Sequence, residues 1–240
     1  GAEFALHHIC DEFGPQLWDR VPILYTCSAE PLIHAMSVDE TSTPGDAPMD
    51  DSVGQAILDA CTVVACIAPH VHAELHGSLV RLLDALVRIT QNEHMVLRSA
   101  GACCFSVLTK CITDKAMHVL VERIVPMLGD STLLHRQGAM EVISRTVRVQ
   151  DERLLPYVLF LVVPVLGRMN DSDESVRLLA TNTFAELVKL VPLIHGLPDP
   201  PNFSPALLAR REEEKAFLSQ LLDGSKVEPY KVPVEMKVQL

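Results

Sequence analysis

This sequence of 240 residues has few aromatic residues and a deficit of basic charge. Aromatic residues make up 5% of the chain while hydrophobic residues make up 48%, so Leu, Val, Ile and Ala carry the apolar content. That composition is typical of stacked helices, whereas a β-sandwich usually needs more aromatics and strand-type alternation. Lys and Arg number 20 against 31 Asp and Glu, and the formal net charge of −11 argues against a surface that binds a phosphate backbone.

Signals for export, membrane insertion and disulfide bonding are missing too. The seven cysteines are an odd number and lie mostly in apolar helical runs, which favours buried, reduced thiols over a disulfide framework. Adjacent Cys103 and Cys104 are interpreted as small core residues and not as a redox pair. No signal peptide is visible. The most apolar run, residues 154–167, is shorter than the roughly 20 residues that span a bilayer, so we expect a buried core helix there and no membrane partner.

Motifs that carry catalysis or bind cofactors are also missing. No Gly is followed by Lys, which excludes a Walker A phosphate loop, and no dinucleotide fingerprint, nucleophile elbow or HExxH pattern occurs. The nearest metal pattern combines His70, His72 and His76 with Glu74. Because these residues lie beside Pro69 at a predicted turn, solvated histidines are the default interpretation and a structural zinc site is the alternative. We therefore expect no catalytic, cofactor or metal residue in this chain.

What the sequence does contain is a repeat of about 40 residues. In three segments an Asn or Asp stands six residues before an Arg, and a small residue stands three residues after that Arg. The three sets are Asn92, Arg98 and Gly101; Asp130, Arg136 and Ala139; and Asp171, Arg177 and Ala180. The arginines are 38 and 41 residues apart, and a P-x-L-G pattern recurs at Pro126 and Pro164, again 38 residues apart.

Each repeat has a physical explanation as two antiparallel helices that bury their apolar faces against the neighbouring repeat. The small residue allows close helix approach, and the Asn or Asp is predicted to cap the following helix. Its spacing to Arg also suits a charge-assisted bond to the next repeat, so that the bonds form a ladder. The Gly of P-x-L-G suits a helix C-terminus, and the Pro is predicted to kink the second helix.

This pattern resembles the HEAT-repeat family over residues 53–192, and the fold class that it implies is an all-α solenoid. HEAT repeats are assigned to residues 53–196, of which residues 53–90 form a degenerate repeat because Gly54 stands where Arg is expected. Residues 1–36 are predicted to form one further helix pair, with helices at 2–10 and 16–36. Pro22 and Pro31 should bend or split the second of them.

Between the pair and the repeats, residues 37–52 combine Pro, Gly and five acidic residues without Lys or Arg. The composition predicts an acidic, disordered insertion. A tolerated loop insertion is the simpler interpretation, and an acidic site for a basic partner is the alternative.

The chain after the repeats has a different composition. Residues 197–204 are predicted to form a proline-rich hinge at Pro198, Pro200 and Pro201. A bridging helix is predicted over 205–223, capped by Ser204 and stopped by Gly224. Its apolar residues cluster at its ends, and Leu218, Leu221 and Leu222 are its predicted docking points. Residues 224–240 alternate apolar and polar residues like a strand, which we interpret as the start of a further domain.

The stretch LPDPPNFSPALLARREEEKAFLSQLLDGSKVEPYKVPV, residues 197–234, resembles the junction between the HEAT array and the motor in Swi/Snf-superfamily ATPases associated with TATA-binding protein. Residues 154–169 and 173–180 are also similar to the last repeats of that family. The resemblance implies a nuclear transcription regulator that uses ATP and Mg²⁺ to remove TATA-binding protein from promoter DNA. This chain would supply the scaffold and the coupling segment, with its own ATPase domain as a partner in cis. The alternative is a generic HEAT-repeat interaction scaffold of the phosphatase-scaffold or transport-receptor type.

Overall fold

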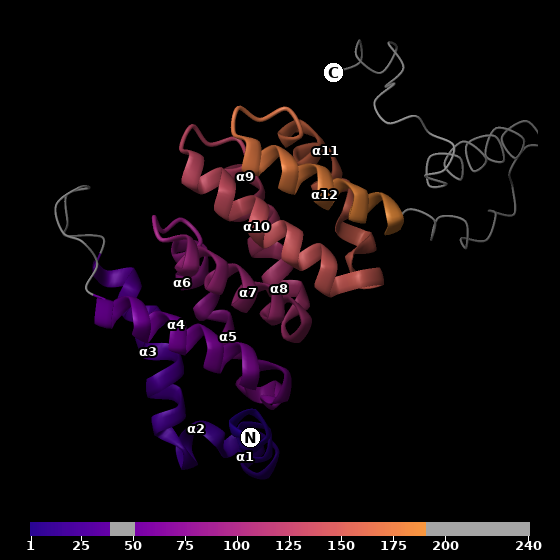
Figure 1. Cartoon of the computed structure of the whole chain (residues 1–240). Helices are drawn as coiled ribbons and strands as arrows, with labels where there is room; N and C mark the ends of the chain where they lie inside the picture. The colour runs from indigo at the N-terminus through magenta and orange to yellow at the C-terminus, as the bar shows by residue number, and fades with distance from the viewer. Residues whose placement is uncertain (39–50, 191–240) are drawn as a thin grey trace, which may run out of the picture. The chain divides into compact units, whose positions relative to one another are not determined.

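The computed structural model describes residues 1–38 and 51–190, and every regular element in these two ranges is a helix (Figure 1). Residues Gly1–Leu187 form one compact unit. In chain order the elements are α1 (Ala2–Phe13), η1 (Gly14–Gln16), α2 (Leu17–Arg20), α3 (Pro22–Val38), α4 (Asp51–Ile67), η2 (Ala68–His70), η3 (Ala73–Leu75), α5 (His76–Val80), α6 (Leu82–Ile89), α7 (Met95–Cys111), α8 (Thr113–Val119), η4 (Leu120–Ile124), α9 (Val125–Met127), α10 (Leu133–Gln150), η5 (Asp151–Tyr157), α11 (Val158–Arg168) and α12 (Glu174–Leu190).

The N-terminal pair consists of α1 and a second helix that is split at Val21. Helix α2 ends at Arg20 and α3 begins at Pro22, while Val21 between them has a φ of −128° and a ψ of 61°. A residue before proline is pushed out of the α region, and proline itself suits the first position of a helix. The predicted split is therefore confirmed at Pro22, whereas α3 continues through Pro31.

Helices extend into both ends of the predicted acidic insertion. Helix α3 runs to Val38 and α4 begins at Asp51, so residues 37–38 and 51–52 are helical and the prediction of disorder is wrong for them. A carboxylate in the first turn of a helix is favoured by the helix dipole, which explains a start at Asp51. Residues 39–50 lie outside the described residues. The predicted hinge, bridging helix and strand-like tail, all within 191–240, lie outside them as well.

The first helices of successive repeats lie next to one another. Helices α4 and α7 are in contact, as are α7 and α10, and a side-chain hydrogen bond connects α10 with α12 (Figure 1). The second helices are formed by α8, η4 and α9 in one repeat and by η5 and α11 in the next. Large side chains without solvent exposure fill the space between the helices, among them Phe105, Met117, Leu120, Ile124 and Met140. The predicted all-α solenoid is confirmed.

Proline and glycine act differently in the two second helices. Before Pro126 the helix widens into the π-helical turn η4, which makes room for a ring that lacks an N–H and crowds the preceding turn. Pro164 instead lies within α11, which continues on both sides of it. Gly129 follows the end of α9 as predicted, but Gly167 lies inside α11, which ends one residue later at Arg168.

The expectation of a buried core helix at residues 154–167 is wrong for one face of that run. Leu154, Val158, Leu161 and Val165 are buried and form the inward face. The opposite face is exposed to solvent, because α11 contributes a single apolar stripe to the unit although its sequence is apolar on all sides.

One helical stretch, Asp51–His70, has the length and hydropathy of a membrane span. Helix α4, which makes up most of it, contacts both α3 and α7, and its residues Ile57, Cys61 and Val64 are buried. Since a core helix has the same composition, we interpret this stretch as part of the helical core.

Candidate functional site

The repeated Asn and Asp residues close a tight turn just before each first helix. The side-chain oxygen of each accepts a hydrogen bond from the backbone N–H two residues later, at 2.8, 2.8 and 3.0 Å. The acceptor–donor pairs are Asn92 with His94, Asp130 with Thr132, and Asp171 with Asp173. The predicted helix cap is therefore wrong in detail, because these donors precede the helix and the motif is an Asx turn. At α12 the cap is Asp173, whose carboxylate accepts from the Val176 N–H at 3.1 Å.

The repeated arginines bind the turn of their own repeat. In each case Nη1 donates to the carbonyl oxygens of the residues six and five positions earlier. Arg98 reaches Asn92 at 2.9 Å and Glu93 at 2.8 Å. Arg136 and Arg177 make the corresponding pairs of bonds at 2.8–3.0 Å. The six-residue spacing is thus explained by a bond within the repeat, in which one guanidinium fixes the turn before the helix that carries it.

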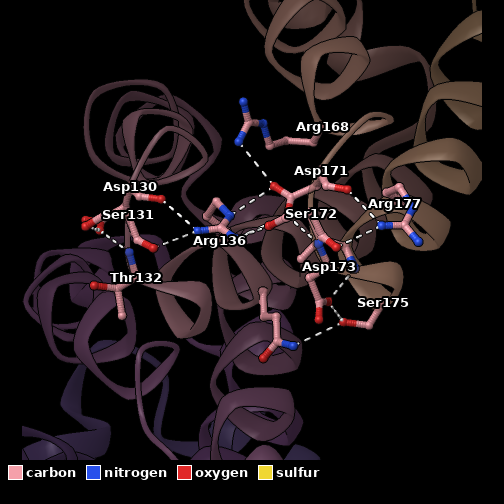
Figure 2. A network of polar contacts seen from close by, with 12 residues as sticks. Asp130, Ser131, Thr132, Arg136, Arg168, Asp171, Ser172, Asp173, Ser175 and Arg177 are labelled. Atoms are coloured by element: carbon pink, nitrogen blue, oxygen red, sulfur yellow. Dashed lines mark hydrogen bonds and ion pairs between the residues drawn. The ribbon is translucent and has the colours of Figure 1, made fainter.

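One rung of the predicted ladder between repeats is present in full. Arg136 donates from Nε and Nη2 to the two carboxylate oxygens of Asp171, at 2.9 and 3.2 Å (Figure 2). Both side chains are buried, with 10% of Arg136 and 1% of Asp171 exposed. Arg168 adds a third bond to Asp171 at 3.2 Å. Such a bidentate, charge-assisted pair holds two repeats in one register.

The electrostatics of this rung favour an ionised carboxylate. Burial raises the pKa of Asp171, but the Asp173 N–H and the Arg136 guanidinium outweigh it and hold the pKa below its ordinary value. The Asp173 pKa is also lowered, through hydrogen bonds from the Ser175 hydroxyl and the Val176 N–H. Charge and geometry therefore fit a structural joint with its polar groups satisfied.

The preceding rung differs from the prediction. Arg98 donates to the neutral side-chain oxygen of Gln137 at 3.3 Å, and not to Asp130. Asp130 is occupied within its own repeat, where its Oδ2 lies 2.9 Å from His135 Nδ1. The bond with His135 and the Thr132 N–H lower the Asp130 pKa to about 2. Gln137 also donates to the Ser175 hydroxyl at 3.1 Å, so it connects its repeat to both neighbours.

The predicted small residues lie at close helix contacts. Gly101, Ala139 and Ala180 are all buried. A methyl group added at Gly101 would lie 2.8 Å from Ile89 Cγ2. The closest approach occurs at Gly138, which sequence reasoning missed. A Cβ there would lie 1.8 Å from the Thr90 carbonyl oxygen, so α10 contacts backbone at the end of α6.

Several polar contacts between repeats also escaped prediction. Arg123 forms an ion pair with Asp84, which connects η4 with α6. Arg145 donates to the Ser99 hydroxyl at 2.7 Å and so connects α10 with α7. These pairs, like Gln137 with Ser175, consist of residue types that are common on surfaces, so no sequence signal distinguishes them. The close contact at Gly138 could have been predicted, since a glycine inside a helix indicates a packing constraint.

The histidine and cysteine candidates do not converge on one site. His72 Nδ1 accepts from the Glu74 N–H at 3.4 Å, and His76 Nε2 lies 3.2 Å from the Val71 carbonyl oxygen. Within residues 1–38 and 51–190, no three His, Cys, Asp or Glu side chains are arranged to hold a metal ion. Cys104 is buried and its pKa is raised by a bond with Cys61 and by burial, but Cys103 is exposed, so the prediction of a core residue is wrong there.

The remaining predicted site residues lie outside the described residues. They are Pro198, Pro200 and Pro201, predicted to form a hinge, and Leu218, Leu221 and Leu222, predicted to be docking points.

Helix pairs stacked at a 38–41-residue period, with an Arg-fixed turn before each first helix, define a HEAT-type solenoid. Residues 58–194 match the family described as "Stalled ribosome sensor GCN1-like, HEAT repeats". The chain belongs to this family of HEAT-repeat proteins.

Whole-chain relatives are more specific. The chain is 44% identical to "TATA-binding protein-associated factor mot1" of Aspergillus fumigatus, over 100% of this chain and 13% of that protein. It is 37% identical to "TATA-binding protein-associated factor 172" of Homo sapiens over the same shares. Identity to "TATA-binding protein-associated factor MOT1" of Saccharomyces cerevisiae is 34%, again over 100% and 13%. The chain thus spans about one eighth of the length of these relatives.

Proposed function

We propose that this chain is the scaffold and coupling segment of a nuclear transcription regulator that uses ATP to remove TATA-binding protein from promoter DNA. The observation that carries the proposal is the extent of the similarity. The alignment with proteins named TATA-binding protein-associated factors covers the whole chain. It therefore includes residues 197–234, the non-repetitive junction that a general HEAT architecture does not require.

The contacts between repeats support a mechanical role. A buried, bidentate bond between Arg136 and Asp171 and a bridging Gln137 resist sliding of one repeat past the next. A stack joined in this way can transmit displacement along its length, because interiors packed at crystal-like density deform little. In the proposed full-length protein, the partners of this segment are TATA-binding protein, the promoter DNA and the protein's own ATPase domain. ATP and Mg²⁺ belong to that ATPase domain.

The family match favours a second candidate, a HEAT scaffold with no motor. The description of the matched family concerns a stalled ribosome sensor and its repeats. The two candidates differ in the coding sequence that follows residue 240. The motor hypothesis predicts a Gly-Lys-Thr phosphate loop within about 60 residues, whereas further Asp-x5-Arg repeats there would support the scaffold.

The functional test uses the full-length protein with Leu218→Asp and Leu221→Asp combined. If these leucines are docking points of the coupling segment, ATP hydrolysis persists while ATP-dependent release of TATA-binding protein from labelled promoter DNA is lost. Glu213→Gln, in the charged middle of the same predicted helix, is the matched control and should leave release intact. Unchanged release in the leucine variant would contradict the coupling role.

A further inference from the structure

Thr146 and Gln150 lie one turn apart on α10 and bring polar atoms into an apolar interior. Thr146 is 0% exposed and Gln150 is 3% exposed. Within the described ranges, Thr146 Oγ1 and both Gln150 side-chain polar atoms, Nε2 and Oε1, are buried and have no hydrogen-bond partner. A polar group that is buried without a partner lowers stability, so these three atoms require an explanation.

Both positions hold aliphatic residues in the neighbouring repeats. At the repeat spacing of 38 residues, Thr146 corresponds to Leu108 and Gln150 corresponds to Ile112, which are 0% and 8% exposed. At the spacing of 41 residues, Thr146 corresponds to Leu187, which is also buried. Two polar residues thus stand together where the stack otherwise has aliphatic side chains. Such a paired exception indicates that the two polar groups act together.

The Thr146 hydroxyl also differs from other helical threonine hydroxyls of this chain. Thr62, Thr181 and Thr183 each donate to the carbonyl oxygen four residues earlier, at 2.7–2.9 Å. That bond satisfies a threonine hydroxyl within its own helix. Thr146 does not make it, so its hydroxyl is available to another group.

The three polar atoms determine which ligand fits. The Gln150 Nε2 donates, its Oε1 accepts, and the Thr146 hydroxyl does both. A water molecule also donates and accepts, and a buried water typically makes about three hydrogen bonds. A cation is disfavoured, because the Nε2 group points hydrogens at it and Ca²⁺ takes at least about six oxygen ligands. Thr is smaller than the corresponding Leu by about one methyl group, which is close to the size of a water molecule.

We propose that Thr146 and Gln150 bind an internal water molecule in the repeat formed by α10, η5 and α11. The water accepts from the Gln150 amide group and bonds to the Thr146 hydroxyl one turn earlier. It supplies the partners that the aliphatic residues of the neighbouring repeats do not need. The interior of this repeat is therefore hydrated at the end of α10.

The first test detects the water directly by nuclear magnetic resonance in the complete, isotope-labelled chain. The Gln150 side-chain NH₂ should show a nuclear Overhauser contact with water that has the sign of a long-lived complex. Loss of the signal in Gln150→Met identifies its resonance. Gln55 is the control, because its exposed amide donates to Asp59 on the surface of α4 and should show the sign of rapidly exchanging water.

The second test uses variants of similar shape and urea unfolding. Thr183→Val calibrates the loss of a satisfied buried hydroxyl and should lower the urea midpoint by about 0.5 M. Thr146→Val should lower it by a similar amount, because the water loses a partner. Gln150→Met should also lower it, and the two changes combined should cost less than their sum. Circular dichroism checks the fold of each variant.

Three results would overturn the proposal. A higher urea midpoint in Thr146→Val and in Gln150→Met would show that the polar groups are buried without any partner. Coupling between the two variants without a water contact at Gln150 would assign a direct bond between the two side chains. A Gln150 amide that shows the same rapid exchange of water as Gln55 would place it in contact with solvent and not with an internal water.

Discussion

The buried rung between Arg136 and Asp171 allows a quantitative prediction. The change Asp171→Ala removes the carboxylate that accepts two bonds from Arg136, one from Arg168 and one from the Asp173 N–H. Arg136 then remains in a site where its side chain is only 10% exposed. Its Nη1 keeps the bonds to the carbonyl oxygens of Asp130 and Ser131. Its Nε and Nη2 each lose the hydrogen bond that they donated to Asp171.

Removal of one partner from a buried ion pair costs about 3–5 kcal/mol, because the other charge stays buried without compensation. Since Arg136 keeps two bonds to carbonyl oxygens, we expect Asp171→Ala to lower the free energy of unfolding by about 3 kcal/mol, at the lower end of this range. With a urea dependence of about 2 kcal/mol/M, the unfolding midpoint should fall by about 1.5 M. Repeat stacks lose structure unit by unit when one interface is weakened, so the amides of α12 should exchange earliest.

The assay is urea unfolding followed by far-ultraviolet circular dichroism, together with hydrogen exchange resolved by peptide. Asp130→Ala is the control, because Asp130 occupies the corresponding position in the preceding repeat but bonds to His135 and not to Arg98. Asp130→Ala should lower the urea unfolding midpoint less than Asp171→Ala does. Arg136→Met and Asp171→Ala combined should cost less than the sum of the two single changes, with a coupling of about 2 kcal/mol. A loss below about 0.5 kcal/mol for Asp171→Ala, or equal losses for the two Asp variants, would refute this account.

Two further predictions follow from the geometry. Gly138→Ala should destabilise the chain by about 2–3 kcal/mol in urea unfolding, because its Cβ meets the Thr90 carbonyl oxygen; Gly167→Ala, with open space around it, should be neutral or stabilising by up to about 1 kcal/mol. The Asp130 pKa is lowered from 3.8 to about 2. The contribution of its ionised carboxylate to folding stability is therefore complete above pH about 4 and is lost as the pH falls towards about 2. In Asp130→Asn the urea unfolding midpoint should therefore fall less between about pH 4 and about pH 2 than in the unmodified chain. An equal fall in both proteins would show that the bond between Asp130 and His135 does not cause this loss of stability.

Period and composition were sufficient to predict the architecture. The recurrence of Arg98, Arg136 and Arg177 located three first helices, because each arginine must lie one turn inside the helix whose preceding turn it fixes. Pro22 located the break between α2 and α3 through a steric rule that depends only on local sequence. Such features are predictable because the interacting groups are within six residues of one another.

Contacts between repeats were predicted less well, because they depend on which acceptor is free. Arg98 and Arg136 have the same local pattern, yet only Arg136 reaches the next repeat's Asp. The difference traces to His135, which holds the Asp130 carboxylate within its own repeat. The exposure of Leu159, Phe160 and Val163 on α11 was also not predicted. A run that is apolar on all sides does not reveal which side the neighbouring helices cover.

The first of these failures has a local origin. A repeat fixes its own turn with local bonds and leaves few polar groups for its neighbours, so each interface has few polar pairs beside its apolar contacts. Of the two arginine rungs, the one beside α12 has the stronger acceptor, the buried Asp171 carboxylate in place of the neutral Gln137 side chain. Loss of the Asp171 acceptor is therefore expected to cost more stability than loss of the Gln137 acceptor.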